Sequence, residues 1–192
     1  MGDISDNGKK RRTAIIGGTF NAMHQGHKEY INLAFEFADE VIIMLATDKF
    51  AQSSKRYPVF SYEIRKARLE NYLNEVNGFK PHRIQEMDSE CDLIQFCTEN
   101  DISMAVIIPE YYSLFQRINL IRKDESKPPL LLIVKERTTT PEGFNLSSTL
   151  INNLINQSQL SPKKYSPDLA SHVDAFKTNT SLPNCVPQHQ VR

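Results

Sequence analysis

The sequence predicts an α/β protein whose core is a doubly wound parallel sheet of five strands. The first observation behind this prediction is an alternation along the chain. Short apolar segments rich in β-branched residues alternate with longer segments whose apolar residues recur at helical spacing. The second observation is the segment 41–46, which is apolar at nearly every position, as expected for a parallel strand buried on both faces.

The first strand, helix and second strand fall within the first 46 residues. Ile15 and Ile16 are β-branched residues fit for a buried strand, which breaks at the pair Gly17 and Gly18. The segment 26–39 carries apolar residues on one side and polar residues on the other, which predicts a helix that covers one face of the sheet. The strand over 41–46 completes this unit.

The later segments continue the alternation. After the second strand the chain is polar and basic over 47–50 and 53–58, which we interpret as a loop. Further along, the pattern predicts helices over 61–76, 92–100 and 111–121, and strands over 82–87, 104–108 and 130–134. A last helix is expected to begin at 146–149, where three hydroxyl residues can cap its N-terminus.

The length and composition favour one domain with tails. A chain of 192 residues with 40% hydrophobic content can bury one sizeable core but is not expected to build two. We therefore expect a single domain over 12–157, preceded by a flexible tail over 1–11. Beyond Gln157 the chain turns to Ser, Pro, Asn and Gln with little apolar content, which predicts a disordered tail over 158–192.

The charge balance and the cysteine content narrow the functional classes. Lys and Arg together number 23, and so do Asp and Glu, so no global field recruits nucleic acid or an anionic membrane. No apolar run approaches the roughly 20 residues needed to cross a bilayer. Three cysteines without framework spacing fit a reducing compartment. We expect a soluble cytoplasmic protein that binds neither nucleic acid nor membrane, and a homo-oligomer stays open.

The stretch 15–27 combines a strand end, a tight turn and a helix start. Such a junction presents backbone N–H groups and the positive end of a helix dipole to an anion. His24 and His27, three residues apart, add imidazole donors on the same side. No Gly-Lys-Ser/Thr closes a P-loop, and no Gly-x-Gly-x-x-Gly follows the strand. The stretch therefore predicts a phosphate-binding site of another kind.

Two other interpretations of the histidine pair stay open. The imidazoles can cap the helix, or they can form part of a metal site. A metal site usually needs further Cys, His or carboxylate ligands, and Cys91 and Cys97 lack zinc-type spacing. We therefore expect no metal held by the protein alone.

The same residues resemble the G-T-F-x-x-x-H-x-G-H signature of the nucleotidylyltransferase superfamily, which transfers NMP units from NTPs to small phosphorylated acceptors. The segment 59–65 is similar to the Phe-x-x-Glu-x-Arg helix start that many of these enzymes carry. The superfamily's Ile-Ser-Ser-Thr-x-Ile motif is matched by Leu146-Ser147-Ser148-Thr149-Leu150-Ile151. Three further segments resemble archaeal and eukaryotic-type phosphopantetheine adenylyltransferases: Pro109-Glu110, Ile118-Asn119-x-x-Arg122 and Pro129-Leu130-x-x-x-Val134. The resemblance covers about 13–156.

The resemblance implies a Rossmann-like fold and an adenylyl transfer of coenzyme A biosynthesis. ATP and 4′-phosphopantetheine would give dephospho-coenzyme A and pyrophosphate. The acceptor phosphate would attack the α-phosphorus in line, so the protein positions two polyanions and stabilises the developing charge. Mg²⁺ would accompany ATP, held mainly by substrate and water.

The resemblance also implies roles for individual residues. His24 and His27 would donate hydrogen bonds to the triphosphate, and Thr19 would orient the acceptor phosphate, which makes these three the expected catalytic residues. The loop after the second strand lies near the histidines, because ligands of open α/β sheets bind outside the carboxyl ends of the strands. The expected nucleotide-binding residues are Gly17, Gly18, Phe20, Lys55, Arg56, Glu110, Asn119, Arg122, Ser147, Ser148 and Thr149.

Three departures from the family patterns leave alternatives open. Asn21 stands where many relatives have Asp, and Asn152 where a basic residue usually follows the Ser-Ser-Thr-x-Ile motif. The segment 60–63 equally resembles glycerol-3-phosphate cytidylyltransferases. Arg137-Thr138, followed by Glu142-Gly143 and the Ser-Ser-Thr, is a loosened form of their Arg-Thr-x-Gly motif. The acceptor and the choice between ATP and CTP therefore stay open. A third hypothesis is a nucleotide-binding protein that has lost catalysis, because Asn152 removes one phosphate countercharge.

Overall fold

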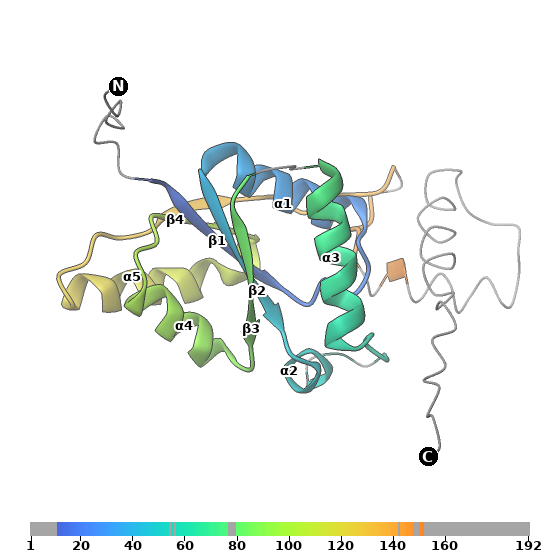
Figure 1. The fold of residues 1–192 in the computed structure, drawn as a ribbon, viewed down its shortest axis with the longest axis horizontal. Coiled ribbons are helices and arrows are strands. Elements are labelled where there is room, and N and C mark those ends of the chain that lie inside the picture. Colours follow the sequence, from blue (N-terminus) through green and yellow to red (C-terminus); the bar gives the residue numbers. More distant parts are fainter. Residues whose placement is uncertain are drawn as a thin grey trace, which may run out of the picture. The chain divides into compact units, whose positions relative to one another are not determined.

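Five parallel strands form the central sheet in the order β3-β2-β1-β4-β5 (Figure 1). Every pairing is parallel, and β1 lies between β2 and β4. The predicted doubly wound α/β fold with five parallel strands is confirmed. The computed structural model describes residues 11–53, 55, 57–76, 80–141, 143–147 and 150–151. It divides into two units, Met1–Thr138 and Thr139–Arg192, which we describe separately.

Strands and helices alternate through the first unit. Their bounds are β1 Thr13–Gly18, α1 Gln25–Phe37, β2 Glu40–Ala46, α2 Asp48–Ser53, α3 Tyr62–Val76, β3 His82–Met87, α4 Glu90–Glu99, β4 Met104–Ile107, the 3-10 helix η1 Pro109–Tyr111, α5 Tyr112–Asp124 and β5 Leu131–Val134. Among the described residues, no helix combines the length and the apolar character that a membrane span requires.

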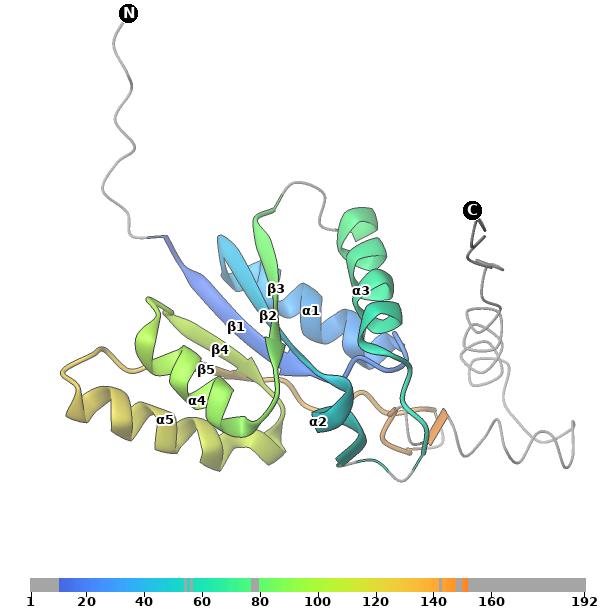
Figure 2. The same cartoon turned by 60° about the horizontal axis from the view of Figure 1, so that its bottom comes forward.

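Helices cover both faces of the sheet (Figure 2). Ala14 and Ile16 of β1 join one apolar layer and Ile15 joins the other, because successive side chains of a strand point to opposite faces. The first layer contains α1 and α3, and the second contains α4 and α5. The later helices lie on the opposite face from the earlier ones because the crossover connections are right-handed. The chain advances from β1 to β3 in one direction and then crosses to β4 and β5 on the other side of β1.

The strand order reverses at β1, which places a topological switch point between β1 and β4. Open α/β sheets bind ligands in the crevice outside the carboxyl ends of the strands at such a point. Gly18 ends β1 and Ile107 ends β4. The residues that follow these two strands therefore share the edge where the fold favours a binding site.

The predicted loop over 47–50 and 53–58 is wrong in its first part, because Asp48–Ser53 form the short helix α2. Thr47 Oγ1 accepts a hydrogen bond from Phe50 N at 3.5 Å and donates one to Asp88 at 2.7 Å. It therefore caps α2 and ties it to the end of β3. The six residues of α2 are too few to show helical periodicity, so their polar composition favoured a loop. The other predicted boundaries differ from the observed ones by only a few residues.

The described residues of the second unit form a turn and a helix start. Thr139 and Asn145 make an isolated antiparallel bridge, and Gly143 between them has a φ of 85°, which favours glycine. Ser147 Oγ accepts a hydrogen bond from Leu150 N at 3.2 Å, which is a helix cap of the kind expected from the sequence. The predicted tails, apart from residue 11, lie outside the described residues, and the single domain over 12–157 stays a prediction.

Candidate active site

The turn between β1 and α1 has an uncommon backbone. Phe20 has a φ of 48°, a left-handed conformation that is rare for a residue with a Cβ. Its ring is buried against His27 and Tyr30, with centroids 5.1 and 6.5 Å away. A Cβ on Gly18 would lie 3.2 Å from this ring, so the absence of a side chain at residue 18 leaves room for the ring. Strained backbone of this kind clusters at functional sites.

His24 and His27 lie side by side at the N-terminus of α1. Their rings are stacked, with centroids 3.8 Å apart and planes inclined by 18°. His24 is the N-cap residue, and its Nδ1 accepts a hydrogen bond from His27 N at 3.3 Å. A Cβ on Gly26 would lie 3.2 Å from the His24 ring and 3.3 Å from Thr138 Oγ1. The glycine of the His-x-Gly-His pattern therefore makes room for the first imidazole.

The hydrogen bonds place different protons on the two rings. Because His24 Nδ1 is an acceptor, the proton of the neutral ring lies on Nε2, which is a donor. His27 Nδ1 lies 2.5 Å from the Ala22 carbonyl oxygen, which can only accept. Nδ1 of His27 therefore carries the proton, and Nε2 of the neutral ring is an acceptor. His24 is ready to donate to a phosphate, whereas His27 must first take up a second proton.

The surroundings keep His27 neutral. Burial of the ring lowers the pKa of His27 to about 4, the hydrogen bond to Ala22 opposes this shift, and the charges of Lys55 and Arg137 add to it. Both cations therefore act on the ring from nearby. A bound polyphosphate would reverse the balance, because its negative charge favours the protonated imidazole.

A polar cluster joins the segment after β5 to the first turns of α1. Lys135 Nζ lies 3.0 Å from Glu29 Oε2 and donates to Thr138 Oγ1 at 3.0 Å. Thr138 Oγ1 donates to the same carboxylate at 2.6 Å. Burial alone raises the pKa of Glu29, but hydrogen bonds from Thr138, Lys135 and Gln25 outweigh it and hold the pKa below its ordinary value. This cluster fixes the segment after β5 beside the His-x-Gly-His turn.

Arg137 and Glu110 form an ion pair at the same edge, with Arg137 Nε 2.6 Å from Glu110 Oε1. Glu110 lies on η1, close after the end of β4. Burial alone raises the pKa of Glu110, but hydrogen bonds from Arg137 and the backbone, with the Arg137 charge, lower it overall. Both side chains are partly exposed, so water weakens the pair and a phosphate can compete for Arg137.

The structure brings most predicted site residues of the first unit to the carboxyl edge of the sheet. They are Gly17, Gly18, Thr19, Phe20, His24, His27, Lys55 and Glu110. Of these, Phe20 contributes packing, because its ring is buried. Arg56, Ser148 and Thr149 lie outside the described residues, and Ser147 belongs to the second unit. Their nucleotide-binding roles stay predictions.

Asn119 and Arg122 are not brought to this edge. The Asn119 amide donates to the Leu130 carbonyl at 3.0 Å and accepts from Leu130 N at 2.7 Å. The guanidinium of Arg122 is buried and donates to the carbonyls of Cys97, Ile102 and Pro128. These partners precede β4 and β5, at the amino edge of the sheet. Asn119 and Arg122 of the Ile-Asn-x-x-Arg pattern therefore hold the loop before β5 in place. Their position does not support a contact with phosphates bound at Gly18.

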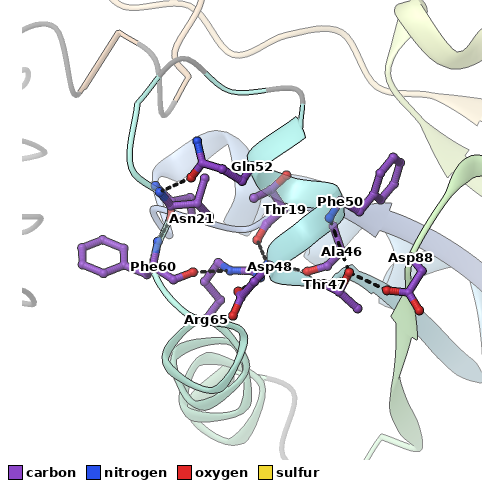
Figure 3. Close-up of polar contacts among 11 residues, drawn as sticks. Thr19, Asn21, Ala46, Thr47, Asp48, Phe50, Gln52, Phe60, Arg65 and Asp88 are labelled. Carbon is purple, nitrogen blue, oxygen red and sulfur yellow. Dashed lines mark hydrogen bonds and ion pairs between the residues drawn. The ribbon is translucent and has the colours of Figure 1, made fainter.

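Sequence reasoning gave no role to Arg65, Lys135 or Glu29. Arg65 is fully buried, and its guanidinium reaches four segments of the chain (Figure 3). Its one signal in the sequence is its place in the Phe-x-x-Glu-x-Arg resemblance. The ion pair of Lys135 with Glu29 joins residues far apart in the chain, so no local pattern indicates it.

The fold and the site together define a doubly wound α/β protein whose first helix presents a histidine pair at the carboxyl edge of its sheet. Residues 15–154 match the cytidylyltransferase-like family. The chain belongs to this family, within the nucleotidylyltransferase superfamily.

Two relatives are consistent with this membership, and one solved structure shares the fold. A phosphopantetheine adenylyltransferase of Methanosarcina mazei is 34% identical over 139 residues, which are 71% of this chain and 88% of that protein. A bifunctional phosphopantetheine adenylyltransferase/NTP phosphatase of Thermoplasma acidophilum is 33% identical over 140 residues, 72% of this chain. The chain spans 41% of the length of that bifunctional relative. A crystal structure of a protein with unknown function from Archaeoglobus fulgidus shares the fold, with a TM-score of 0.57, 24% identity and coverage of 71% of this chain and 99% of that chain.

Proposed function

We propose that this chain transfers the adenylyl group of ATP to 4′-phosphopantetheine, giving dephospho-coenzyme A and pyrophosphate. The observation that carries nucleotidyl transfer is the histidine pair stacked at the N-terminus of α1, beside the switch point of the sheet. Such a helix start binds phosphate through its N–H groups and dipole. The acceptor is supported by the 34% identity to a protein named phosphopantetheine adenylyltransferase.

The proposed reaction needs position and charge rather than a protein nucleophile. An oxygen of the acceptor phosphate attacks the α-phosphorus of ATP and forms the new phosphoanhydride bond. The bond from the α-phosphorus to the bridging oxygen breaks, and pyrophosphate leaves with the electron pair. Thr19 orients the acceptor phosphate, His24 donates to the triphosphate through Nε2, and His27 gains a proton as the negative charge arrives.

Lys55 and Arg137 supply positive charge for the phosphates in this proposal. Both lower the pKa of His27 by their charge, so a polyphosphate beside that ring would interact with both. Arg137 is therefore our choice for the countercharge that Asn152 does not provide. Mg²⁺ would enter with ATP, held mainly by phosphate oxygens and water. We expect the reaction to take place in the cytoplasm, a reducing compartment that fits the three cysteines without framework spacing.

Cytidylyl transfer is the second candidate function. It is favoured by the match of residues 15–154 to a family described as cytidylyltransferase-like. The phosphate contacts proposed here would suit either nucleotide, because every NTP carries the same triphosphate. A protein that binds nucleotide without transfer is the remaining alternative.

A pyrophosphate-release screen separates these candidates. The purified chain is tested with ATP or CTP and Mg²⁺ against 4′-phosphopantetheine, glycerol 3-phosphate, phosphocholine and nicotinamide mononucleotide. We expect release with ATP and 4′-phosphopantetheine, and its loss in His24→Ala. Release with CTP and another acceptor instead would replace the adenylyl proposal, and nucleotide binding without release from any pair would contradict transfer altogether.

A further inference from the structure

Arg65 of α3 is a fully buried arginine that joins four parts of the chain at the carboxyl edge (Figure 3). Its Nε donates to one carbonyl, its Nη1 to two carbonyls, and its Nη2 to a carboxylate. The partners are Phe60 O at 2.8 Å, Thr19 O at 2.9 Å, Ala46 O at 2.7 Å and Asp48 Oδ1 at 2.9 Å. Four of the five guanidinium donors are thereby used, which is the condition for burying such a charge.

Two of these partners continue the pairing of β1 with β2. The register ends with Gly18 opposite Leu45, and the next residues are Thr19 and Ala46. Arg65 Nη1 binds both of their carbonyls, so the guanidinium bridges the strands where their backbone ladder stops. Arg65 therefore joins the two chain segments that leave β1 and β2 at the carboxyl edge of the sheet.

The turn over 19–22 is held by contacts at each of its residues, and the last of these contacts reaches His27. Phe20 has the left-handed φ of 48°, a conformation that persists only when its surroundings fix it. Asn21 Oδ1 accepts a hydrogen bond from Phe60 N at 2.8 Å, and Ala22 O binds His27 Nδ1 at 2.5 Å. Arg65 binds the carbonyl of Thr19, where this turn begins, and the carbonyl of Phe60, whose N–H binds Asn21 in the turn. The proton position on His27 thus depends on a turn that Arg65 anchors.

We propose that Arg65 is a positioning residue for the transfer reaction: by bridging Thr19, Ala46 and Phe60, it holds the turn 19–22 in the shape that presents Thr19 and His27 to the substrate phosphates. This inference rests on the proposed function. Arg65 touches no reacting atom, so its contribution is the geometry of the residues that do.

The chain contains a matched control for this proposal. Arg122 is equally a buried arginine, and its guanidinium also binds three carbonyls, but at the amino edge of the sheet. If Arg65 served the fold alone, the Lys variants of the two arginines would behave alike. A lysine keeps the charge in both cases but cannot span several carbonyls as a guanidinium does.

The test compares Arg65→Lys with Arg122→Lys by melting temperature and by kcat and KM in the pyrophosphate-release assay. Both variants should melt below the wild type. We expect kcat of Arg65→Lys to fall roughly 100-fold with a much smaller change in KM for ATP, as misplacement by about 1 Å can cause. Arg122→Lys should keep the wild-type kcat below its melting temperature. Equal losses of kcat in the two variants, or an unchanged kcat in Arg65→Lys, would overturn the proposal.

A second readout requires no turnover. Nitrogen NMR of the His27 imidazole should show the Nδ1–H form in the wild type and a mixture of the two neutral forms in Arg65→Lys, with the wild-type form kept in Arg122→Lys. An unchanged His27 in Arg65→Lys would contradict the positioning role. If the wild type releases no pyrophosphate with any acceptor, the proposed function fails, while this measurement still decides the role of Arg65.

Asp48→Ala covers the case in which Arg65→Lys does not fold. The Asp48 side chain is 59% exposed, so its truncation leaves the core intact while Nη2 of the guanidinium loses its acceptor. We expect the same two signals to change in the same direction, by less. Wild-type kcat and a wild-type His27 spectrum in Asp48→Ala would then reject the proposal.

Discussion

At the scale of single residues, the two histidines of the candidate site differ in what they can offer a phosphate. Ala22 fixes the single proton of His27 on Nδ1, so contact of a phosphate with Nε2 requires a second proton. We predict that ATP binding at pH 7 is coupled to proton uptake by His27. Titration calorimetry in two buffers of different ionisation enthalpy measures this uptake, and His27→Gln should lose it. Equal uptake by the wild type and the variant would place the proton elsewhere.

The same residue predicts how stability depends on pH. The pKa of His27 falls from 6.5 to about 4 in the fold, so the unfolded chain binds this proton first as pH drops. The stabilising contribution is complete above pH 6.5 and is lost as pH falls toward 4; a shift of this size amounts to at most about 3 kcal/mol. Urea unfolding at pH 7 and pH 5 should show a larger loss in the wild type than in His27→Gln. Parallel losses in both proteins would mean that His27 is not held neutral.

At the scale of elements, Gly26 in the first turn of α1 lies in a helix, where alanine is favoured, but beside the His24 ring, where a Cβ is crowded. Gly26→Ala should stabilise the helix by up to about 1 kcal/mol through propensity. Its Cβ would nevertheless press on the His24 ring at 3.2 Å and on Thr138. We therefore predict a variant that keeps or gains melting temperature but loses kcat. A Gly26→Ala variant with wild-type kcat would show that His24 needs no such space.

The segment after β5 offers an element-scale test of charge. Arg137→Gln should weaken ATP binding about tenfold or more, because a charge-assisted hydrogen bond contributes roughly 1.5–3 kcal/mol. Glu110→Gln should leave binding unchanged or tighter, since it releases Arg137 from its ion pair. Arg83→Gln on β3 controls for the loss of a positive charge, as Arg83 stacks on Phe96 instead. Equal ATP affinity in Arg137→Gln and Arg83→Gln would remove Arg137 from the site.

At the scale of the whole molecule, local sequence patterns predicted the sheet and the part of the site between β1 and α1. The parts of the site that depend on contacts between distant segments could not be predicted in this way. The strands 41–46 and 82–87 and the turn at Gly17 are visible in the sequence because periodicity and glycine act locally. Helix α2 is too short for periodicity, and the pair of Lys135 with Glu29 joins distant segments. Asn119 and Arg122 matched a family pattern, but in the structure their side chains bind the loop before β5, a contact that no local pattern indicates.

The assembled site has a consequence for the stability of the entire first unit. It draws on the ends of β1 and β4, the loop after α2 and the segment after β5, so a bound nucleotide links elements from both sides of the switch point. Binding to the folded state alone stabilises by about 2.7 kcal/mol at a hundredfold excess over Kd. In a chain of this size that is roughly 5–10 °C in melting temperature. We predict such a shift with ATP and Mg²⁺, a smaller one with CTP, and one from tripolyphosphate that shows how much the phosphates contribute. A larger shift with CTP would favour the cytidylyl candidate, and tripolyphosphate equal to ATP would mean that the base adds nothing, because the site would then recognise only the phosphates.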